Sequence, residues 1–220
     1  MAYRTSKETQ ERKDLKKKHI IDTSIRVFAE NGYYATSVKS IVDAAEVSVG
    51  TFYFYFKNKE DLFEILYDEL SDQFYEALCK YFNNIDVEVD RDLSKAITFL
   101  LLVIEKNQSL AKILFIEAVG LNPSFELNRA KVMNKFTDYA TFYFEQMYHN
   151  KQISVPDTRI AAVAFIGALN NVVMDWLLNN SNHKLTDSVY GLAIYNLQAL
   201  GICYKEDQVR AGISEILLTM

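Results

Sequence analysis

The stretch VGTFYFYFKNKEDL (residues 49–62) places five consecutive aromatic residues between a glycine and a charged segment. Such a run favours a β-strand by propensity alone. No neighbouring segment offers a convincing strand to pair with it, and a lone strand is unstable, so we expect a helix here. Helical geometry places Phe52 and Phe56 on one face. Tyr53 and Phe54 then point away from that face, which predicts a surface that meets a partner.

The composition of the chain favours helices over turns. Half of the 220 residues are hydrophobic, only 2 are proline and 7 are glycine, so the chain can bury a core but is poor in turn residues. Only Cys79 and Cys203 are present, with neither a CxxC pair nor metal-ligand spacing. This favours a reducing, cytoplasmic location without a metal site. We expect no signal peptide and no apolar run long enough to span a membrane.

Charge is distributed unevenly along the chain. Residues 1–60 carry a net charge of +3 and residues 61–220 a net charge of −8. A small basic head on an acidic body is compatible with a nucleic-acid site confined to the head. Chance explains an excess of this size as well, so the charge is only secondary evidence.

Helical periodicity covers nearly the whole sequence. Asn31-Gly32 ends the first helix, Thr36 is a plausible N-cap for the second, and Asn58 is expected to cap the fourth. The linker 83–92 alternates apolar and acidic residues and reads equally as a strand, though without a partner. The expected helices span about 8–31, 37–46, 48–56, 59–82, 91–106, 109–120, 123–150, 157–180, 185–201 and 206–218.

Residues 37–56 have the organisation of a helix-turn-helix motif. A short helix is followed by a tight turn at Ala45-Glu46-Val47, and Ser48 opens a second short helix. The major groove of DNA is wide enough to admit one helix, whose N-terminal residues reach the base edges. The motif therefore predicts DNA binding.

The segment Phe28–Phe63 resembles the N-terminal domain of TetR-family transcriptional regulators. The matching pieces are F-A-x-x-G-Y, T-S-V-x-x-I, V-S-x-G-T-x-Y-x-Y-F and K-x-K-E-x-L, over roughly 36 consecutive positions. The resemblance implies an all-α chain, with an N-terminal three-helix helix-turn-helix domain (residues 1–57) and a helical ligand-binding and dimerisation domain (residues 58–220). The family usually has glycine where this chain has Glu46, so we expect a strained positive φ and an added anion near DNA.

Carried over position by position, the resemblance implies contacts with a double-stranded DNA operator. Ser37 would cap its helix and touch a phosphate, and Tyr53 would place its hydroxyl on another. Residues around Gly50 would form the tip of the recognition helix, and lysines would hold the DNA backbone. The expected DNA-binding residues are Ser37, Lys39, Ser48, Val49, Gly50, Thr51, Tyr53, Tyr55, Lys57 and Lys59.

In the resembling family the C-terminal helices bind a small molecule and pair two subunits. The aromatic stripe of 123–150 and the polar interruptions of 157–180 fit a mostly apolar cavity, in which two acids would favour a cationic ligand. An ordinary core explains the same stripe. The expected ligand-binding residues are Glu117, Phe136, Tyr139, Tyr143 and Asp175. Small residues allow close helix approach, and the expected dimer-interface residues are Ala161, Ala164, Ala168, Leu192, Tyr195 and Ala199.

The leading hypothesis is a ligand-responsive repressor. It would bind a palindromic operator as a homodimer and be released by a small, mostly apolar effector, with no cofactor and no membrane partner. The alternatives are a helical enzyme with a dispersed active site and a sequence-independent DNA-binding protein. His19, His149 and His183 show no metal-ligand spacing, and the sequence has neither a phosphate-binding loop nor a nucleophile elbow, which disfavours an enzyme.

Overall fold

The computed structural model describes residues 7–82, 88–179 and 183–219, and within these ranges it contains helices and no strand. The expected all-α fold is confirmed. The elements are α1 (Lys7–Asn31), α2 (Val38–Ala44), α3 (Val49–Tyr55), α4 (Lys59–Phe82), α5 (Val89–Lys106), α6 (Gln108–Lys112), the π-helix η1 (Ile113–Glu117), α7 (Pro123–His149), α8 (Thr158–Asn179), the 3₁₀-helix η2 (Leu185–Ser188), α9 (Val189–Ala199) and α10 (Glu206–Thr219).

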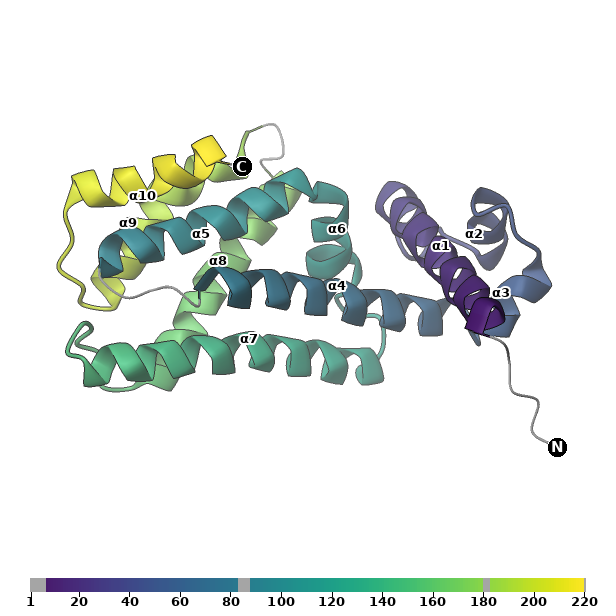
Figure 1. Cartoon of the computed structure of the whole chain (residues 1–220), viewed down its shortest axis with the longest axis horizontal. Helices are drawn as coiled ribbons and strands as arrows, with labels where there is room; N and C mark the ends of the chain where they lie inside the picture. The colour runs from purple at the N-terminus through teal and green to yellow at the C-terminus, as the bar shows by residue number, and fades with distance from the viewer. Residues whose placement is uncertain (1–6, 83–87, 180–182, 220) are drawn as a thin grey trace.

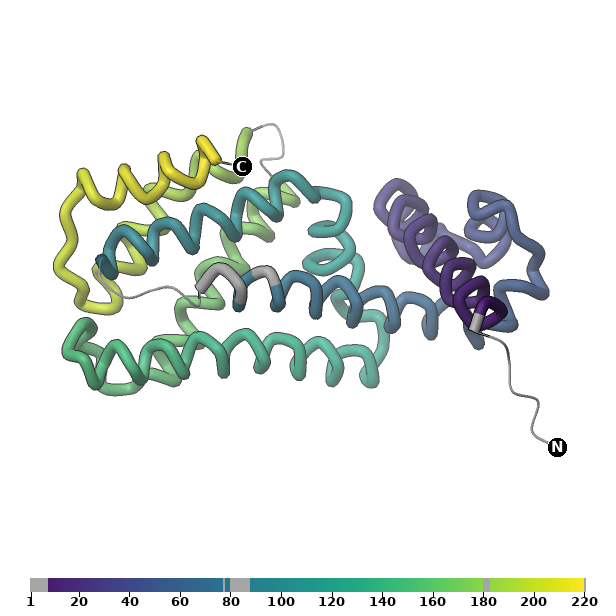
Figure 2. Tube along the Cα trace, in the orientation of Figure 1, coloured from purple at the N-terminus to yellow at the C-terminus, as the bar shows by residue number. Residues whose placement is uncertain are grey.

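The helices form a small head and a larger body joined by one long helix. Figure 1 shows α1, α2 and α3 grouped at one end, and α5 to α10 gathered at the other. Helix α4 runs out of the head and along the body beside α7, and the trace in Figure 2 follows the same path. Because α4 belongs to both parts, a movement of α4 in the body would also displace the head.

The core of the head is built largely from aromatic side chains. Phe28, Phe52 and Phe63 are fully buried, Phe56 is 1% exposed, and the rings of Phe28 and Phe63 meet edge to face at 5.1 Å. The same cluster includes Leu62, Leu66 and Tyr67 of α4, and reaches Ile113, Ala118 and Phe125 beyond it. The first half of α4 thus packs as part of the head, and the expected boundary at residue 57 stays a prediction.

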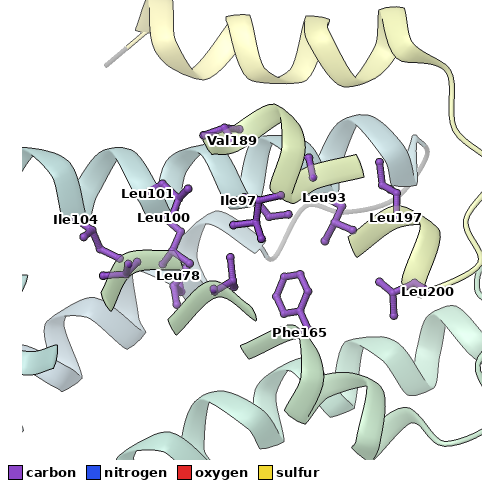
Figure 3. Close-up of a cluster of buried hydrophobic side chains, with 14 of the residues drawn as sticks. Leu78, Leu93, Ile97, Leu100, Leu101, Ile104, Phe165, Val189, Leu197 and Leu200 are labelled. Carbon is purple, nitrogen blue, oxygen red and sulfur yellow. The ribbon is translucent and has the colours of Figure 1, made fainter. Parts of the chain in front are cut away.

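The core of the body surrounds α5. Figure 3 shows aliphatic side chains of α4, α5 and α9 converging with Phe165 of α8. Helix α5 is buried on most sides, and its inward hydroxyls are satisfied because Ser94 and Thr98 donate to the carbonyls of Asp90 and Ser94, each at 2.6 Å. Helix α10 lies close against α5: a Cβ on Gly212 would stand 2.6 Å from the Arg91 carbonyl oxygen.

Several expected boundaries need correction. Ser37, not Thr36, is the N-cap of α2, and Thr36 instead donates to the Gly32 carbonyl at 2.7 Å. Helix α5 begins at Val89, whereas residues 83–87, where a strand was considered, lie outside the described residues. The single helix expected over 109–120 is divided into α6 and the π-helix η1.

Candidate functional site

The helix-turn-helix unit is defined by two serine caps. Ser37 Oγ accepts from the Ser40 amide at 3.0 Å, and Ser40 Oγ accepts from the Ser37 amide at 3.0 Å, which completes a capping box at the start of α2. Ser48 Oγ accepts from the Thr51 amide at 3.0 Å and opens α3. A capping side chain satisfies an otherwise unpaired helix amide and is typically worth about 1 kcal/mol. The expected capping roles of both serines are thus confirmed, and their contacts with DNA stay predictions.

The turn between α2 and α3 depends on an unusual glutamate. Glu46 has φ +53°, in the left-handed region, as expected from the sequence. Its amide donates to the Asp43 carbonyl at 3.3 Å, and the Val47 amide donates to the Val42 carbonyl at 3.0 Å. This pair of bonds is the Schellman ending of a helix, in which glycine usually fills the left-handed position. The turn therefore keeps its geometry although Glu46 must bear the strain.

Helix α3 has the two faces that the sequence predicts. Phe52 and Phe56 face the head core, whereas Tyr53 is 56% exposed and Phe54 is 63% exposed. Tyr55 lies between the two faces and packs partly against the core. An exposed aromatic pair on a seven-residue helix costs solvation free energy unless a partner covers it. The exposed face of α3 is the best-supported candidate for contact with DNA.

Gly50 supports the same conclusion from a different direction. The only heavy atom near a Cβ built on this residue is Ser48 Oγ, at an unstrained 3.8 Å. The head itself therefore has no steric need for glycine, which costs about 1 kcal/mol relative to alanine inside a helix. The glycine fits the expected close approach of DNA to this helix, which stays a prediction.

Two of the three expected lysines lie on the exposed surface. Lys57 is exposed just beyond α3. Lys39 is exposed and pairs with Asp43 at 2.9 Å, a hydrogen bond that raises the pKa of the lysine. DNA would have to compete with that carboxylate for Lys39.

Lys59 is the least exposed of the three lysines and makes contacts within the head. Its ammonium donates to the carbonyls of Tyr33 at 2.8 Å and Thr36 at 2.9 Å, and lies 4.1 Å from the centroid of the Tyr33 ring. Lys59 therefore fastens the loop before α2 to the start of α4, and its contact with the DNA backbone stays a prediction.

Sequence reasoning missed the contribution of α1 to this face. The ammonium of Lys13 lies over the exposed ring of Phe54, 5.4 Å from its centroid. The first turns of α1 thus stand beside α3, as Figure 1 also shows. No spacing in the sequence signals this contact, because it joins residues 41 positions apart through the packing of the head.

The body contains two adjoining apolar cavities between α4, α5, α7 and α8. The first has a volume of about 80 Å³ and the second about 60 Å³. Both lie below the several hundred Å³ typical of a small-molecule site. The two share the lining residues Leu78, Leu100, Phe136, Ile166 and Leu169. The two cavities therefore adjoin, and we call them together the channel; their walls must separate before a large ligand can enter.

The two ends of the channel differ in polarity. Arg129, Ser71 and Asn170 line the end nearer the head, where the Arg129 Nε donates to Glu126 at 3.2 Å. The far end is apolar apart from Tyr139 and Tyr143, whose hydroxyls lie 3.3 Å apart. Burial raises the pKa of Tyr139, so its hydroxyl stays neutral. An apolar chain with one anionic end would match this polarity.

The expected ligand-binding residues divide into two groups. Phe136, Tyr139 and Tyr143 do line the channel. Asp175 does not: it lies in a separate groove between α8 and α9. Glu117 does not either, because its Oε2 accepts from the Tyr33 amide of the head at 2.7 Å. A pairing of these two acids around a cationic ligand is therefore excluded.

Helices α8 and α9 present an exposed face on the outside of the body. Exposed positions recur along it at helical spacing, namely Ile160, Val163, Ala164, Asn171, Leu178, Gly191, Tyr195 and Ala199. A groove of about 780 Å³ runs between the two helices. Leu192, expected at a dimer interface, is instead buried in the body core, and Ala161 is partly buried there.

Helix α8 is long and apolar enough to cross a membrane by length and composition. The expectation that no segment reaches this length is therefore wrong. The helix packs against α7 and α9 in the body, so a buried core face and an exposed partner face together explain its composition.

The described residues contain no group of three or more His, Cys, Asp or Glu side chains placed to hold a metal ion. The groups of polar side chains discussed above are helix caps, ion pairs and the residues at the end of the channel nearer the head.

Comparison with known proteins extends these findings. Residues 20–66 match the family described as bacterial regulatory proteins, tetR family. The chain is 29% identical over 174 residues to the fatty acid metabolism regulator protein of Bacillus subtilis (strain 168), covering 76% of this chain and 86% of that protein. Among solved structures, the fatty acid degradation regulator FadR from Bacillus halodurans has a TM-score of 0.77 at 26% identity, covering 86% of this chain and 97% of that one. FadR from Bacillus subtilis in complex with stearoyl-CoA has a TM-score of 0.75 at 24% identity, covering 82% and 97%. At 24% identity, the likeness to this last structure shows a shared fold.

Proposed function

The chain belongs to the TetR family of bacterial transcriptional regulators, and on that premise we propose that it is a cytoplasmic repressor released by a long-chain fatty acyl group carried as its coenzyme A thioester. The observation that carries the effector class is the narrow apolar channel between α4, α5, α7 and α8. The names of the relatives support the same class of effector. The mostly apolar effector expected from the sequence is kept, and the channel polarity favours an anionic ligand over the cationic one that Glu117 and Asp175 would favour.

The length of the channel supports a long chain. Arg129 lines one end and Phe144 lines the other, both on α7. Fifteen residues separate them, which is about 22 Å along a helix. An extended chain advances about 1.2 Å per bond, since three backbone bonds span about 3.6 Å. The channel therefore accommodates an acyl group of roughly 18 carbons by length.

The ends of the channel support an orientation for this effector. The guanidinium of Arg129 can donate to the thioester carbonyl at the head of the acyl group, aided by Ser71 and Asn170, which line the same cavity, and the anionic phosphates of coenzyme A would lie beyond this end. The apolar tail then runs between Phe136 and Phe144 towards Tyr143. An uncharged hydrocarbon of equal length would leave Arg129 with Glu126 as its partner and would bind less tightly.

Operator binding requires two heads. TetR-family regulators act as dimers, and we propose that the exposed face of α8 and α9 joins the two chains. Gly167 and Gly191 on these helices have nothing within 4 Å of an added Cβ, which favours close approach by a partner helix. Two recognition helices on one side of DNA must stand about 34–36 Å apart, one helical turn.

The channel offers a route from effector to operator through α4. A long acyl group exceeds the volume of the two cavities, so its entry must push α4 and α7 apart. Phe74 and Leu78 of α4 line the channel, whereas Leu62 and Leu66 of the same helix belong to the head core. A shift of α4 would therefore turn the head and change the separation of the two recognition helices. Only a difference in acyl affinity between the two arrangements can drive this release.

The test is a binding titration. An operator duplex is selected from random palindromes, and its affinity for the full-length protein is measured by fluorescence anisotropy with stearoyl-CoA, butyryl-CoA or free coenzyme A. We expect stearoyl-CoA to weaken the affinity at least about tenfold, which corresponds to about 1.4 kcal/mol. The other two should have little effect. Equal release by free coenzyme A, or no release by stearoyl-CoA, would reject the proposed effector class.

A further inference from the structure

The π-helix η1 stands between the channel and the head. Its wide turn is closed by a hydrogen bond from the Ala118 amide to the Ile113 carbonyl at 3.0 Å. Ile113 and Ala118 are fully buried in the head cluster, whereas Leu114 and Phe115 line the first cavity. Residues five apart do not share a face of an ordinary α-helix, but in the π turn Ile113 and Ala118 both face the head. The residues between them can therefore face the channel. Single π turns inside helices frequently mark functional sites.

The last residue of this turn bonds directly to the head. Glu117 Oε2 accepts from the Tyr33 amide at 2.7 Å, across 84 positions of sequence. A charge-assisted bond of this length is among the stronger hydrogen bonds in proteins. The neighbouring Gly32 has φ +78°, a conformation that favours glycine, and a Cβ there would lie 3.4 Å from both carboxylate oxygens, in ordinary van der Waals contact.

Tyr33 is held from the other side by α4. The Lys59 ammonium donates to the carbonyls of Tyr33 and Thr36, at 2.8 and 2.9 Å, and lies over the Tyr33 ring. Thr36 immediately precedes Ser37, the N-cap of α2. The loop 32–36 thus joins the π turn, the start of α4 and the helix-turn-helix motif at one point.

We infer that Glu117 couples the channel to the head in addition to α4: a ligand that displaces Leu114 and Phe115 moves the π turn and withdraws the carboxylate from the Tyr33 amide. The inference rests on the proposed function, which supplies the ligand and the operator. It adds Glu117 as a residue that connects the two sites. Channel filling and the Glu117–Tyr33 bond then exclude each other. Because coupling between two sites is reciprocal, cutting the bond should weaken operator binding and strengthen ligand binding.

The experiment compares Glu117→Ala with a matched control. Glu105 Oε2 accepts from the Thr186 amide at 2.8 Å, also across a long sequence separation, but wholly inside the body. Glu105→Ala therefore removes this bond, together with the one that the Thr186 hydroxyl donates to the same oxygen at 2.9 Å, without touching the head. Without added ligand, Glu117→Ala should bind the selected operator at least about fivefold more weakly than Glu105→Ala, the lower end of typical coupling. Equal affinities of the two variants would overturn the inference, whatever the effector is.

Stearoyl-CoA provides the second readout. We expect it to bind Glu117→Ala more tightly than wild type and to change the operator affinity of this variant less. Glu117→Gln, which keeps an acceptor oxygen, should restore most of the wild-type response. If stearoyl-CoA releases wild type and Glu117→Ala by the same factor, Glu117 does not couple the sites. If it releases neither, the proposed effector fails, and the ligand-free comparison still decides the role of Glu117.

Hydrogen exchange tests the inference without any substitution. In the wild-type protein, stearoyl-CoA should speed exchange of the Tyr33 amide in a peptide covering residues 32–36. The Thr186 amide, bonded to Glu105, serves as the internal reference in the same sample. Unchanged protection at Tyr33 in a sample that has bound stearoyl-CoA would contradict the proposed displacement.

Discussion

Replacing Glu46 by glycine should stabilise the protein and strengthen operator binding. Glu46 has φ +53° and an exposed side chain, so its removal loses no packing. A non-glycine residue in the left-handed region destabilises the fold by roughly 1–2 kcal/mol, which the substitution would relieve. The greater freedom of glycine in the unfolded chain opposes this gain by roughly 0.5–1 kcal/mol. The expected net gain is about 0.5–1 kcal/mol. For a chain of this size that is a rise in Tm of roughly 1–4 °C.

Two further variants separate strain from charge at this position. Glu46→Gln removes the anion but keeps the strained side chain, so it should strengthen operator binding without raising Tm. Lys151 is the other described non-glycine residue with positive φ, at +58°, and lies in the body. Lys151→Gly should raise Tm by a similar amount and leave operator affinity unchanged.

The assays are thermal and urea unfolding of each variant, with operator titrations at two salt concentrations. The affinity gain of Glu46→Gln should be larger at low salt, because the Debye length shortens as salt is added. A Glu46→Gly protein that is no more stable than wild type would refute the strain argument. An unchanged operator affinity in Glu46→Gln would refute the placement of this turn near DNA.

Three other substitutions test the DNA face, the dimer face and the channel. Gly50→Ala should stabilise the head by about 1 kcal/mol yet weaken operator binding, and stronger binding in the titration would contradict the close approach of DNA. Tyr195→Arg places a charge on the exposed face of α9, so sedimentation at micromolar concentration should detect monomers; an intact dimer would place the interface elsewhere. Ala140→Phe fills the far end of the channel and should shift the preferred effector to shorter acyl chains. The control Ala130→Phe, at an exposed site on α7, should leave the preferred chain length unchanged. The same preference in both variants would argue against an acyl tail at the far end of the channel.

Local signals predicted the head well. The inward and outward faces of α3 followed from helical spacing, and the positive φ of Glu46 followed from the resemblance, because the family usually has glycine at that turn. The cap at Asn58 also formed, with its Oδ1 accepting from the Asp61 amide at 2.7 Å. Each of these features depends on residues within a few positions of one another.

Features that depend on distant contacts were not predictable. Glu117 looked like a ligand residue because it interrupts an apolar run, but its partner amide is 84 positions away. Arg129 gave no signal, because a lone arginine on a helix is usually a surface residue. The π turn was not predictable because its sequence has ordinary helical propensity, and the turn faces both the head cluster and the cavity.

The narrowness of the channel also governs how quickly the protein can respond. An acyl group cannot enter by diffusion alone, because about 80 Å³ of space near Phe136 must first be enlarged by helix separation. Such collective motions take microseconds to milliseconds, and association that awaits them is slower than a simple encounter. Once inside, the tail leaves only when the same helices part again. If acyl-CoA is the effector, as proposed, release of the operator would therefore lag behind the arrival of acyl-CoA by at least the time that these motions take.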